Sequence, residues 1–258
     1  MLRLFRTIRK KLIEQDNIRK YLLYAVGEIF LVVVGILIAL QVNNWNEDRK
    51  NRNAVDQYIA SILQDIDSDI EALTDYRDLM IADSIAIAGL QERILAPLAT
   101  TDTLKQIARY EFLIPVRTMP PLFNPTFQAM SSSGDIKLLN KEAAEMLQRF
   151  YADKNELMEV YTVSMTDYGS AVQAYMEDIP TPEAEFVFDF QFINSKQADK
   201  IWDNIDEDQL SLSFNRIGLY RSVVSSLNLF TIRPFLQQAK TLQDSLIAQY
   251  PNAEKLSE

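Results

Sequence analysis

The stretch YLLYAVGEIFLVVVGILIALQV, from Tyr21 to Val42, decides how this chain folds. Its 22 residues carry a single charge, on Glu28. A helix rises about 1.5 Å per residue, so the stretch would extend over roughly 33 Å, whereas the hydrocarbon core of a bilayer is about 30 Å thick. The stretch therefore predicts one N-terminal transmembrane helix, over residues 21–42.

Basic residues on the two sides of this stretch predict its orientation. Seven lysines and arginines precede it, whereas the three that follow closely, Arg49, Lys50 and Arg52, are interleaved with acidic residues. Because the stronger basic cluster stays in the cytoplasm, residues 1–20 are expected inside and residues 43–258 outside. This predicts a single-pass membrane protein with the lipid bilayer as its first partner.

Two alternatives concern the N-terminal part of the chain. A cleaved signal peptide has an apolar run of about 7–15 residues and a small-x-small cleavage site. This run is longer and no such site follows Val42, so an uncleaved anchor is favoured. Residues 1–20 are either an amphipathic helix in the membrane interface or a topology signal that happens to be helical. Their apolar residues recur at spacings of three and four: Leu2, Phe5, Ile8 and Leu12.

The composition excludes several kinds of site. The chain has no cysteine and no histidine, so it has no disulfide, no thiol nucleophile and no imidazole base or metal ligand. We therefore expect no catalytic site, no metal site and no cofactor. Residues 1–42 carry a net charge of +4 and residues 43–258 a net charge of −14. An acidic outer domain argues against nucleic acid as a partner.

Apolar residues at helical spacing predict three long helices after the span. The first covers residues 47–95, the second 140–179 and the third 196–249, in which Pro234 should kink or divide the helix. Together they predict an all-α fold, an extracytoplasmic up-and-down helical bundle. The stripe of the first helix is Val55, Ile59, Ile62, Ile66, Ile70, Leu73, Tyr76 and Met80; that of the second is Leu147, Tyr151, Lys154, Met158, Tyr161, Met165, Tyr168, Val172 and Tyr175; that of the third begins Leu210, Phe214, Ile217, Arg221, Val224 and Leu227.

Shorter elements join these helices. Residues 100–113 are expected to form a short helix, and another should start at Pro125 after an N-cap at Asn124 and stop at Gly134. Residues 183–193 alternate apolar and polar side chains like a strand. Because no partner strand is evident, they are interpreted as an extended packed connection.

A proline-rich loop before Pro125 is the first candidate docking site. If it is exposed, its apolar residues form a docking loop, and if it folds over the end of the bundle, they form a cap. The sequence leaves both alternatives open. These residues are Val116, Met119, Leu122 and Phe123.

Two stretches resemble a known family. They are GEIFLVVVGILIALQVNNWNEDRKNR, Gly27 to Arg52, and PTFQAMSSSGDIKLLNKEAAEMLQRFY, Pro125 to Tyr151. With the basic start LFRTIRKKL and the segment YIASILQDIDSDI, they are similar to a family of uncharacterised bacterial single-pass membrane proteins, a domain of unknown function. The resemblance implies a short inner segment, one span and a helical outer domain, and it brings no activity, ligand or catalytic residue. Together with the predicted orientation, the resemblance to a bacterial family implies the bacterial inner membrane and a periplasmic domain.

The transmembrane stretch itself contains the second candidate site. Glu28, Gly35 and Ala39 share one helix face, because seven-residue spacing returns nearly to the same angle. Gly35 and Ala39 form a small-x-x-x-small pair that lets another helix approach closely, and an intramembrane charge tends to be paired or functional. This favours an interface with a second copy or a partner membrane protein. The alternative is that Glu28 reaches the inner membrane surface through local thinning.

Three other patterns are interpreted as structural. Asp65, Asp67 and Asp69 form D-x-D-x-D, but an EF-hand loop would need glycine and glutamate where Ile70 and Tyr76 stand, so a solvated helix face is expected. The tyrosine and methionine stripe of residues 147–175 is interpreted as core in preference to a ligand groove. The chain shows neither a G-x-S-x-G motif nor a phosphate loop.

These observations favour a non-enzymatic interaction or scaffold protein anchored in the bacterial envelope. A sensory ectodomain is the alternative, because helical bundles outside a single span are a common form of sensor. The short inner segment of about 20 residues counts against it, since it holds no output domain and signalling would need a partner protein. An enzyme is the least favoured class, since histidine, cysteine and catalytic motifs are all absent.

Overall fold

The structure is a computed structural model that describes residues 18–114, 117–122, 124–180, 182–183 and 193–257. Nearly all of the predicted basic segment, and residues 184–192 of the predicted extended connection, therefore lie outside the described residues. The chain divides into two compact units, Met1–Asp56 and Gln57–Glu258.

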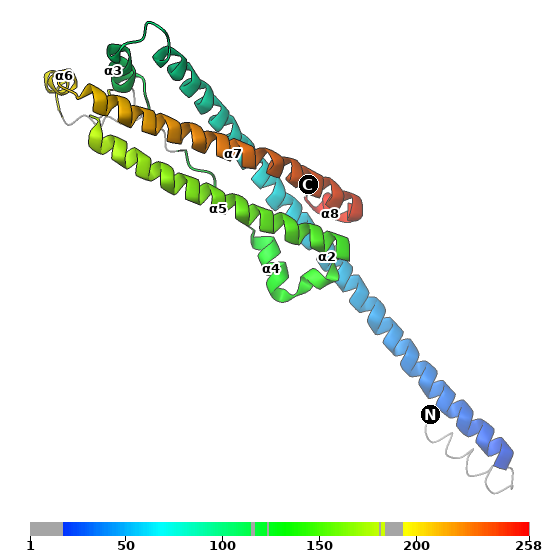
Figure 1. The fold of residues 1–258 in the computed structure, drawn as a ribbon. Helices are drawn as coiled ribbons and strands as arrows, with labels where there is room; N and C mark the ends of the chain where they lie inside the picture. Colours follow the sequence, from blue (N-terminus) through cyan, green and yellow to red (C-terminus); the bar gives the residue numbers. More distant parts are fainter. Residues whose placement is uncertain (1–17, 115–116, 123, 181, 184–192, 258) are drawn as a thin grey trace. The chain divides into compact units, whose positions relative to one another are not determined.

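The described residues are helical almost throughout and contain no strand, so the predicted all-α class is confirmed (Figure 1). The short 3₁₀ helix η1 (Asp135–Leu138) accompanies the α-helices. These are α2 (Ile18–Ile94), α3 (Thr101–Tyr110), α4 (Pro125–Ser133), α5 (Lys141–Asp178), α6 (Ser195–Asp203), α7 (Glu207–Gln249) and α8 (Pro251–Ser257).

In the first unit, the described residues all belong to α2. By length and composition, α2 is the one helix in the described part of the chain that could cross a membrane, and none of its most apolar window is buried within the protein. A signal sequence near an N-terminus has the same properties. The apolar side chains from Leu22 to Val42 have no protein core around them, which suits burial in lipid.

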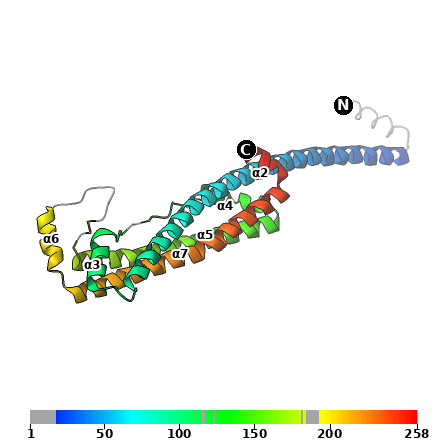
Figure 2. The same cartoon turned by 90° about the horizontal axis from the view of Figure 1, so that it is seen from above.

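In the second unit, α5 and α7 lie side by side along most of their length (Figure 2). Side chains from residues 57–94 of α2 contact both helices. Lys154 of α5 donates a hydrogen bond to Asp69 of α2. Seven residues further along each helix, the rings of Tyr76 and Tyr161 meet edge to face at 6.1 Å. The equal increments show that α2 and α5 run in the same direction.

Helix α7 runs the opposite way. Gln243 donates to Asp67 at 2.6 Å and Arg221 donates to Asp83 at 2.7 Å, so higher numbers in α2 meet lower numbers in α7. Helices α5 and α7 thus follow the predicted up-and-down order. The predicted order does not hold between α2 and α5, which are parallel neighbours, so the chain between them must travel back along the bundle.

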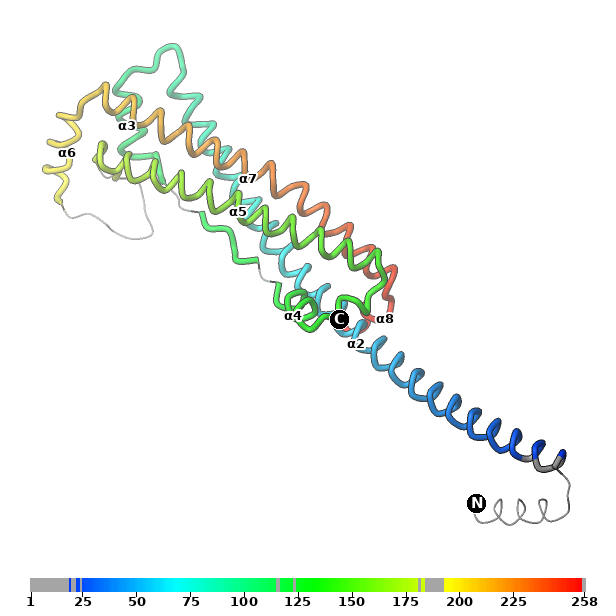
Figure 3. Tube along the Cα trace, turned by 60° about the horizontal axis from the view of Figure 1, so that its bottom comes forward, coloured from blue at the N-terminus to red at the C-terminus, as the bar shows by residue number. Residues whose placement is uncertain are grey.

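The proline-rich segment makes this return. Phe112 packs at 5.8 Å from Tyr175, near the end of α5, and the Met119 N–H donates to the Tyr161 hydroxyl at 2.8 Å, near its middle. Figure 3 shows the segment descending from α3 to α4 beside α5. Proline suits an extended chain because its φ is fixed and it has no N–H to donate.

Local signals fix most helix ends as predicted. Asn140 caps α5 by accepting from the Ala143 N–H at 2.8 Å. Gly134 ends α4 in the left-handed region, with φ 78°. Asn124 precedes Pro125 as predicted, although its side chain makes no capping bond.

The third predicted helical region is divided, but not at Pro234. The break lies at residues 204–206, where Asp206 starts α7 by accepting from the Gln209 N–H at 2.9 Å. Helix α7 continues through Pro234, so the expected division there is wrong. The proline is exposed, while Phe235 and Leu236 beside it are buried, so core packing holds the helix together where one hydrogen bond is lost.

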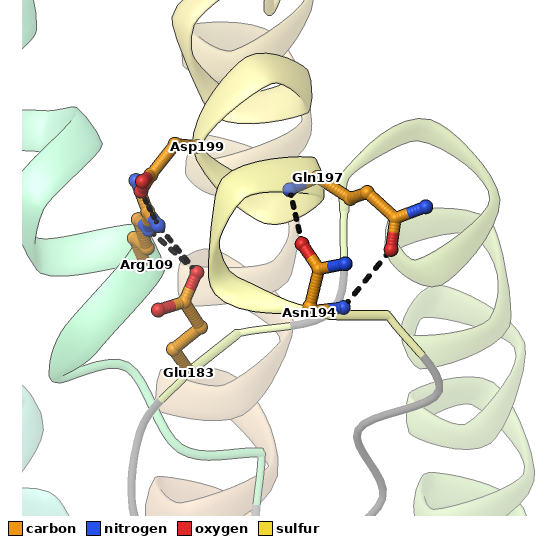
Figure 4. A network of polar contacts seen from close by, with 5 residues as sticks. All are labelled: Arg109, Glu183, Asn194, Gln197 and Asp199. Carbon is orange, nitrogen blue, oxygen red and sulfur yellow. Dashed lines mark hydrogen bonds and ion pairs between the residues drawn. The ribbon is translucent and has the colours of Figure 1, made fainter.

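Arg109 links three segments at the end of the bundle where α5 ends and α7 begins. Arg109 of α3 donates to Glu183 at 2.8 Å and to Asp199 of α6 at 2.6 Å (Figure 4). Its carbonyl also accepts from the Glu183 N–H at 2.6 Å. These bonds hold both ends of the α5–α6 connection against α3, while Asn194 and Gln197 form the capping box that starts α6.

Candidate interaction surface

The predicted transmembrane interface lies within α2. Glu28 is half-buried, whereas Gly35 and Ala39 are exposed. A Cβ atom built on Gly35 would meet nothing within 4 Å. The small-residue face therefore has room for a close helix neighbour, and its role in association stays a prediction.

The described residues of the predicted docking loop differ in how far they are exposed. Met119 is buried, with 6% of its surface exposed, and Leu122 is half-buried. Val116 and Phe123 lie outside the described residues. For Met119 an exposed docking role is wrong, because its side chain is buried and its backbone N–H is bound to Tyr161 of α5. It lies along the side of the bundle and not over its end, since the segment is the return connection.

The acidic triplet is not the solvated face that the sequence predicts. Only Asp67 is exposed, whereas Asp69 is buried and Asp65 is half-buried with one buried oxygen that has no hydrogen-bond partner. The reason is that α2 packs against α5 and α7 together, which covers a wider face than one stripe. Ile70, expected in the core, is half-buried beside Asp69.

Asp69 pairs with Lys154, the residue that interrupts the apolar stripe of α5. Burial raises the pKa of the Asp69 carboxyl, and the hydrogen bond from Lys154 opposes this. A lysine at a core position is itself a signal that a buried acid faces it. The sequence thus indicated that Lys154 has an acidic partner. It did not show which of the three aspartates of the triplet that partner is.

A second buried cation shapes the other half of the bundle. Arg221 donates through Nε and Nη2 to the two oxygens of Asp83, at 3.1 and 2.7 Å, and through Nη1 to the Leu113 carbonyl at 2.5 Å. One guanidinium thus joins α7, α2 and the start of the return segment. The sequence placed Arg221 in the inward stripe, but nothing in it identified these partners.

Helix α7 also carries an apolar stripe that no part of the described chain covers. Leu212, Leu219, Val223 and Phe230 are 73%, 61%, 51% and 78% exposed. Their spacings of seven, four and seven residues keep them on one face. Apolar spacing alone did not reveal this stripe, because it is interleaved with the inward one. The surplus of apolar residues in α7 was the available signal.

A groove between α5 and α7 adjoins this stripe. Its volume is about 450 Å³. Val160 and Val163 of α5 face Tyr220, Val223 and Leu227 of α7 across an apolar floor. Such a floor, continuous with an exposed apolar stripe, is the form of surface that binds an amphipathic helix.

The α5 side of the groove is acidic. Glu156, Glu159 and Asp167 line it, and none of them forms an ion pair within the described part of the chain. The nearest basic residue in sequence on α7, Arg221, is bound to Asp83 at 2.7 Å. The groove therefore presents three uncompensated carboxylates beside apolar side chains.

A family model matches residues 28–171. The match runs from Glu28 in the apolar stretch to Ala171 in α5 and covers more than half of the chain. The chain belongs to DUF6090, a family of unknown function. The DUF6090 match includes Asp69, Lys154 and the acidic side of the groove, and it ends before α7. No curated protein and no solved structure matches the chain.

Proposed function

We propose that this DUF6090 protein is a membrane-anchored, non-enzymatic interaction protein of the bacterial envelope. The α5–α7 groove would hold an amphipathic helix of a partner protein. The observation that carries this proposal is the uncovered stripe of Leu212, Leu219, Val223 and Phe230. Water-exposed apolar residues in one row are unfavourable unless a partner covers them.

The negative charge of the groove favours a basic partner helix. A partner helix with lysine or arginine beside its apolar face would pair with Glu156, Glu159 and Asp167. In a symmetric pair of identical grooves, each copy would instead bring the same three carboxylates to the interface. Like charges would then face each other across it, so a basic partner helix is favoured over a second copy.

Anchoring follows from the apolar part of α2 and the basic residues before it. A reporter that is active only outside the cytoplasm tests the orientation. Fused after Glu258 it should be active, and fused after Lys20 it should be silent. The reverse result would place the groove in the cytoplasm.

A designed helical peptide with leucines on one face and lysines beside them tests the groove, using the full chain in nanodiscs. The lysine peptide should bind, with an affinity that falls as salt rises, whereas the same peptide with glutamates should not. Val223→Asp should abolish binding, and Glu159→Lys should weaken it. Lys240→Asp, an exposed position outside the stripe, is the matched control and should leave affinity unchanged.

Equal binding of both peptides, or binding unaffected by Val223→Asp, would overturn this assignment of the groove. Self-association of the full chain that Val223→Asp abolishes would identify a second copy as the occupant and equally contradict it. Oligomeric state in nanodiscs, with and without the substitution, separates these outcomes.

A sensory ectodomain that signals through a partner protein is the second candidate. A cleft between α2 and α7, beside Arg117, favours it. If that cleft takes a ligand and ligand binding alters peptide affinity in the groove, the protein is a sensor.

A further inference from the structure

The cleft beside Arg117 is formed by α2, α7 and the return segment. Its volume is about 260 Å³. One wall is apolar, made by side chains one helical turn apart on α2 together with one from the return segment: Ala82, Ala86, Leu90 and Leu113. A wall of alanine and leucine accepts a short alkyl or aliphatic chain.

The charged residues of the cleft leave one positive charge uncompensated. Asp83 is neutralised by Arg221, and Glu111 is neutralised by Arg93, whose Nη2 donates to Glu111 at 2.8 Å. Arg117 lines the same cleft and forms no ion pair within the described part of the chain. A bound monovalent anion would neutralise the charge of Arg117.

A smaller inner pocket adjoins the cleft, since Asp83, Arg117 and Arg221 line both. Its volume of about 20 Å³ is enough for one water molecule or one oxygen of a ligand. Tyr168 of α5 also lines it. Its Oη is buried and has no hydrogen-bond partner among the described residues, and the residue as a whole is 4% exposed.

The Tyr168 hydroxyl can donate a hydrogen bond, but it has no acceptor among the described residues. Burial raises the pKa of Tyr168 to about 12, so the phenol keeps its proton at neutral pH. A buried donor without a partner is unfavourable, because it has lost its hydrogen bonds to water and gained none in the protein. An acceptor oxygen in the inner pocket would remove that cost.

We propose that this cleft binds a short aliphatic monocarboxylate. One carboxylate oxygen enters the inner pocket and accepts from the Tyr168 hydroxyl, the carboxylate pairs with Arg117, and the chain lies on Ala82, Ala86 and Leu90. The site goes beyond the proposed interaction function, because it shares no lining residue with the α5–α7 groove except Val224, at the inner pocket.

Calorimetric titration of the full chain in nanodiscs with hexanoate tests the proposal, with empty nanodiscs as the blank. Hexanoate should bind, whereas hexanol and hexylamine, which share its chain, should not. Tyr168→Phe should weaken hexanoate about tenfold or more, since a hydrogen bond to a charged group is worth about 1.5–3 kcal/mol. Arg117→Gln should weaken it by a similar factor.

Tyr175→Phe is the matched control. Tyr175 lies on the same helix and its hydroxyl is also buried without a partner, but it lines neither cavity. Its affinity for hexanoate should equal that of the wild type. Thermal melting should show that both tyrosine variants are folded, because each loses only an unpaired hydroxyl.

Three results would overturn the proposal. Hexanol binding as well as hexanoate would show an apolar cleft without an anion site. Unchanged hexanoate affinity in Tyr168→Phe would show that water alone occupies the inner pocket. Absence of any hexanoate binding above the empty nanodisc would remove the site altogether.

Discussion

The Lys154 ammonium donates a hydrogen bond to Asp69 Oδ2 inside the bundle, where the two side chains are 2% and 7% exposed. The pair joins α5 to α2 across 85 positions of sequence. Two charges buried together are close to neutral for stability, but either one left alone is costly. The pair therefore fixes which turn of α5 faces which turn of α2.

Removing one partner of this pair should be strongly destabilising. Lys154→Met leaves the Asp69 carboxylate buried without a cation, so we expect the free energy of unfolding to fall by about 3–5 kcal/mol. Adding Asp69→Leu should restore most of the loss, because an apolar pair of similar volume replaces the ions. Denaturant unfolding of the full chain in detergent measures both. Lys141→Met, whose side chain is 89% exposed, should change stability by less than about 0.5 kcal/mol.

Acid should loosen the contact between the end of α5 and the start of α7. Asp178 accepts from Ser213 at 2.6 Å, Gln209 at 3.1 Å and Arg216 at 2.8 Å, and these bonds, led by that from Ser213, lower the pKa of its carboxyl. A lowered pKa contributes stability above the unfolded-state value, near about 3.9. That contribution is lost as pH falls through the lower folded-state pKa.

Melting temperature measured from pH 5 down to pH 2.5 checks this. The wild type should lose stability more steeply than Asp178→Asn, which has no carboxylate to protonate. Ser213→Ala should lie between the two, since it removes the first of the three donors. Identical slopes in all three proteins would show that Asp178 does not contribute.

Gly134 should not tolerate a side chain, although there is space for one. A Cβ there would meet nothing within 4 Å, but the residue has φ 78°. An L-residue in this region costs about 1–2 kcal/mol, so Gly134→Ala should lower stability by that amount. Gly169→Ala has equal space in the middle of α5 and should instead raise stability by up to about 1 kcal/mol. Equal effects of the two substitutions would contradict the backbone explanation.

The apolar stretch should associate through Glu28, Gly35 and Ala39. Gly35→Leu would push the helices apart, and Glu28→Ala would remove a polar contact worth about 0.6–2 kcal/mol. A transmembrane association assay on residues 15–50 measures both, with Val33→Leu on another face as the control. If both variants associate as well as the parent, the face only contacts lipid.

Local chemistry made much of the fold predictable. Prolines, Asn140 and Gly134 act over a few residues, so the ends of α4 and α5 follow from the sequence. Apolar spacing likewise identified the three long helices. It could not show that α2 and α5 are parallel, because periodicity reports which face is buried and not which neighbour buries it.

The candidate sites were less predictable for the same reason. Lys154 stood out in the sequence because it interrupts the apolar stripe of α5. That it pairs with Asp69 depends on how turns of α5 and α2 that are distant in sequence pack together. Tyr168 was interpreted as core, and it is, yet its unpaired hydroxyl depends on what surrounds it. Nor can sequence separate an apolar residue that is covered, such as Phe214, from one that is left uncovered, such as Phe230.

The return segment has a consequence for the order in which the protein is made. Helix α2 is synthesised first, but the residues that cover it come much later: Arg221 follows Asp83 by 138 positions and Gln243 follows Asp67 by 176. Contacts this distant in sequence form slowly because the intervening chain must be ordered. Until α7 has emerged, the apolar face of α2 stays open to other chains. The surface that the finished protein hides is therefore the surface through which the growing chain is most open to misassociation.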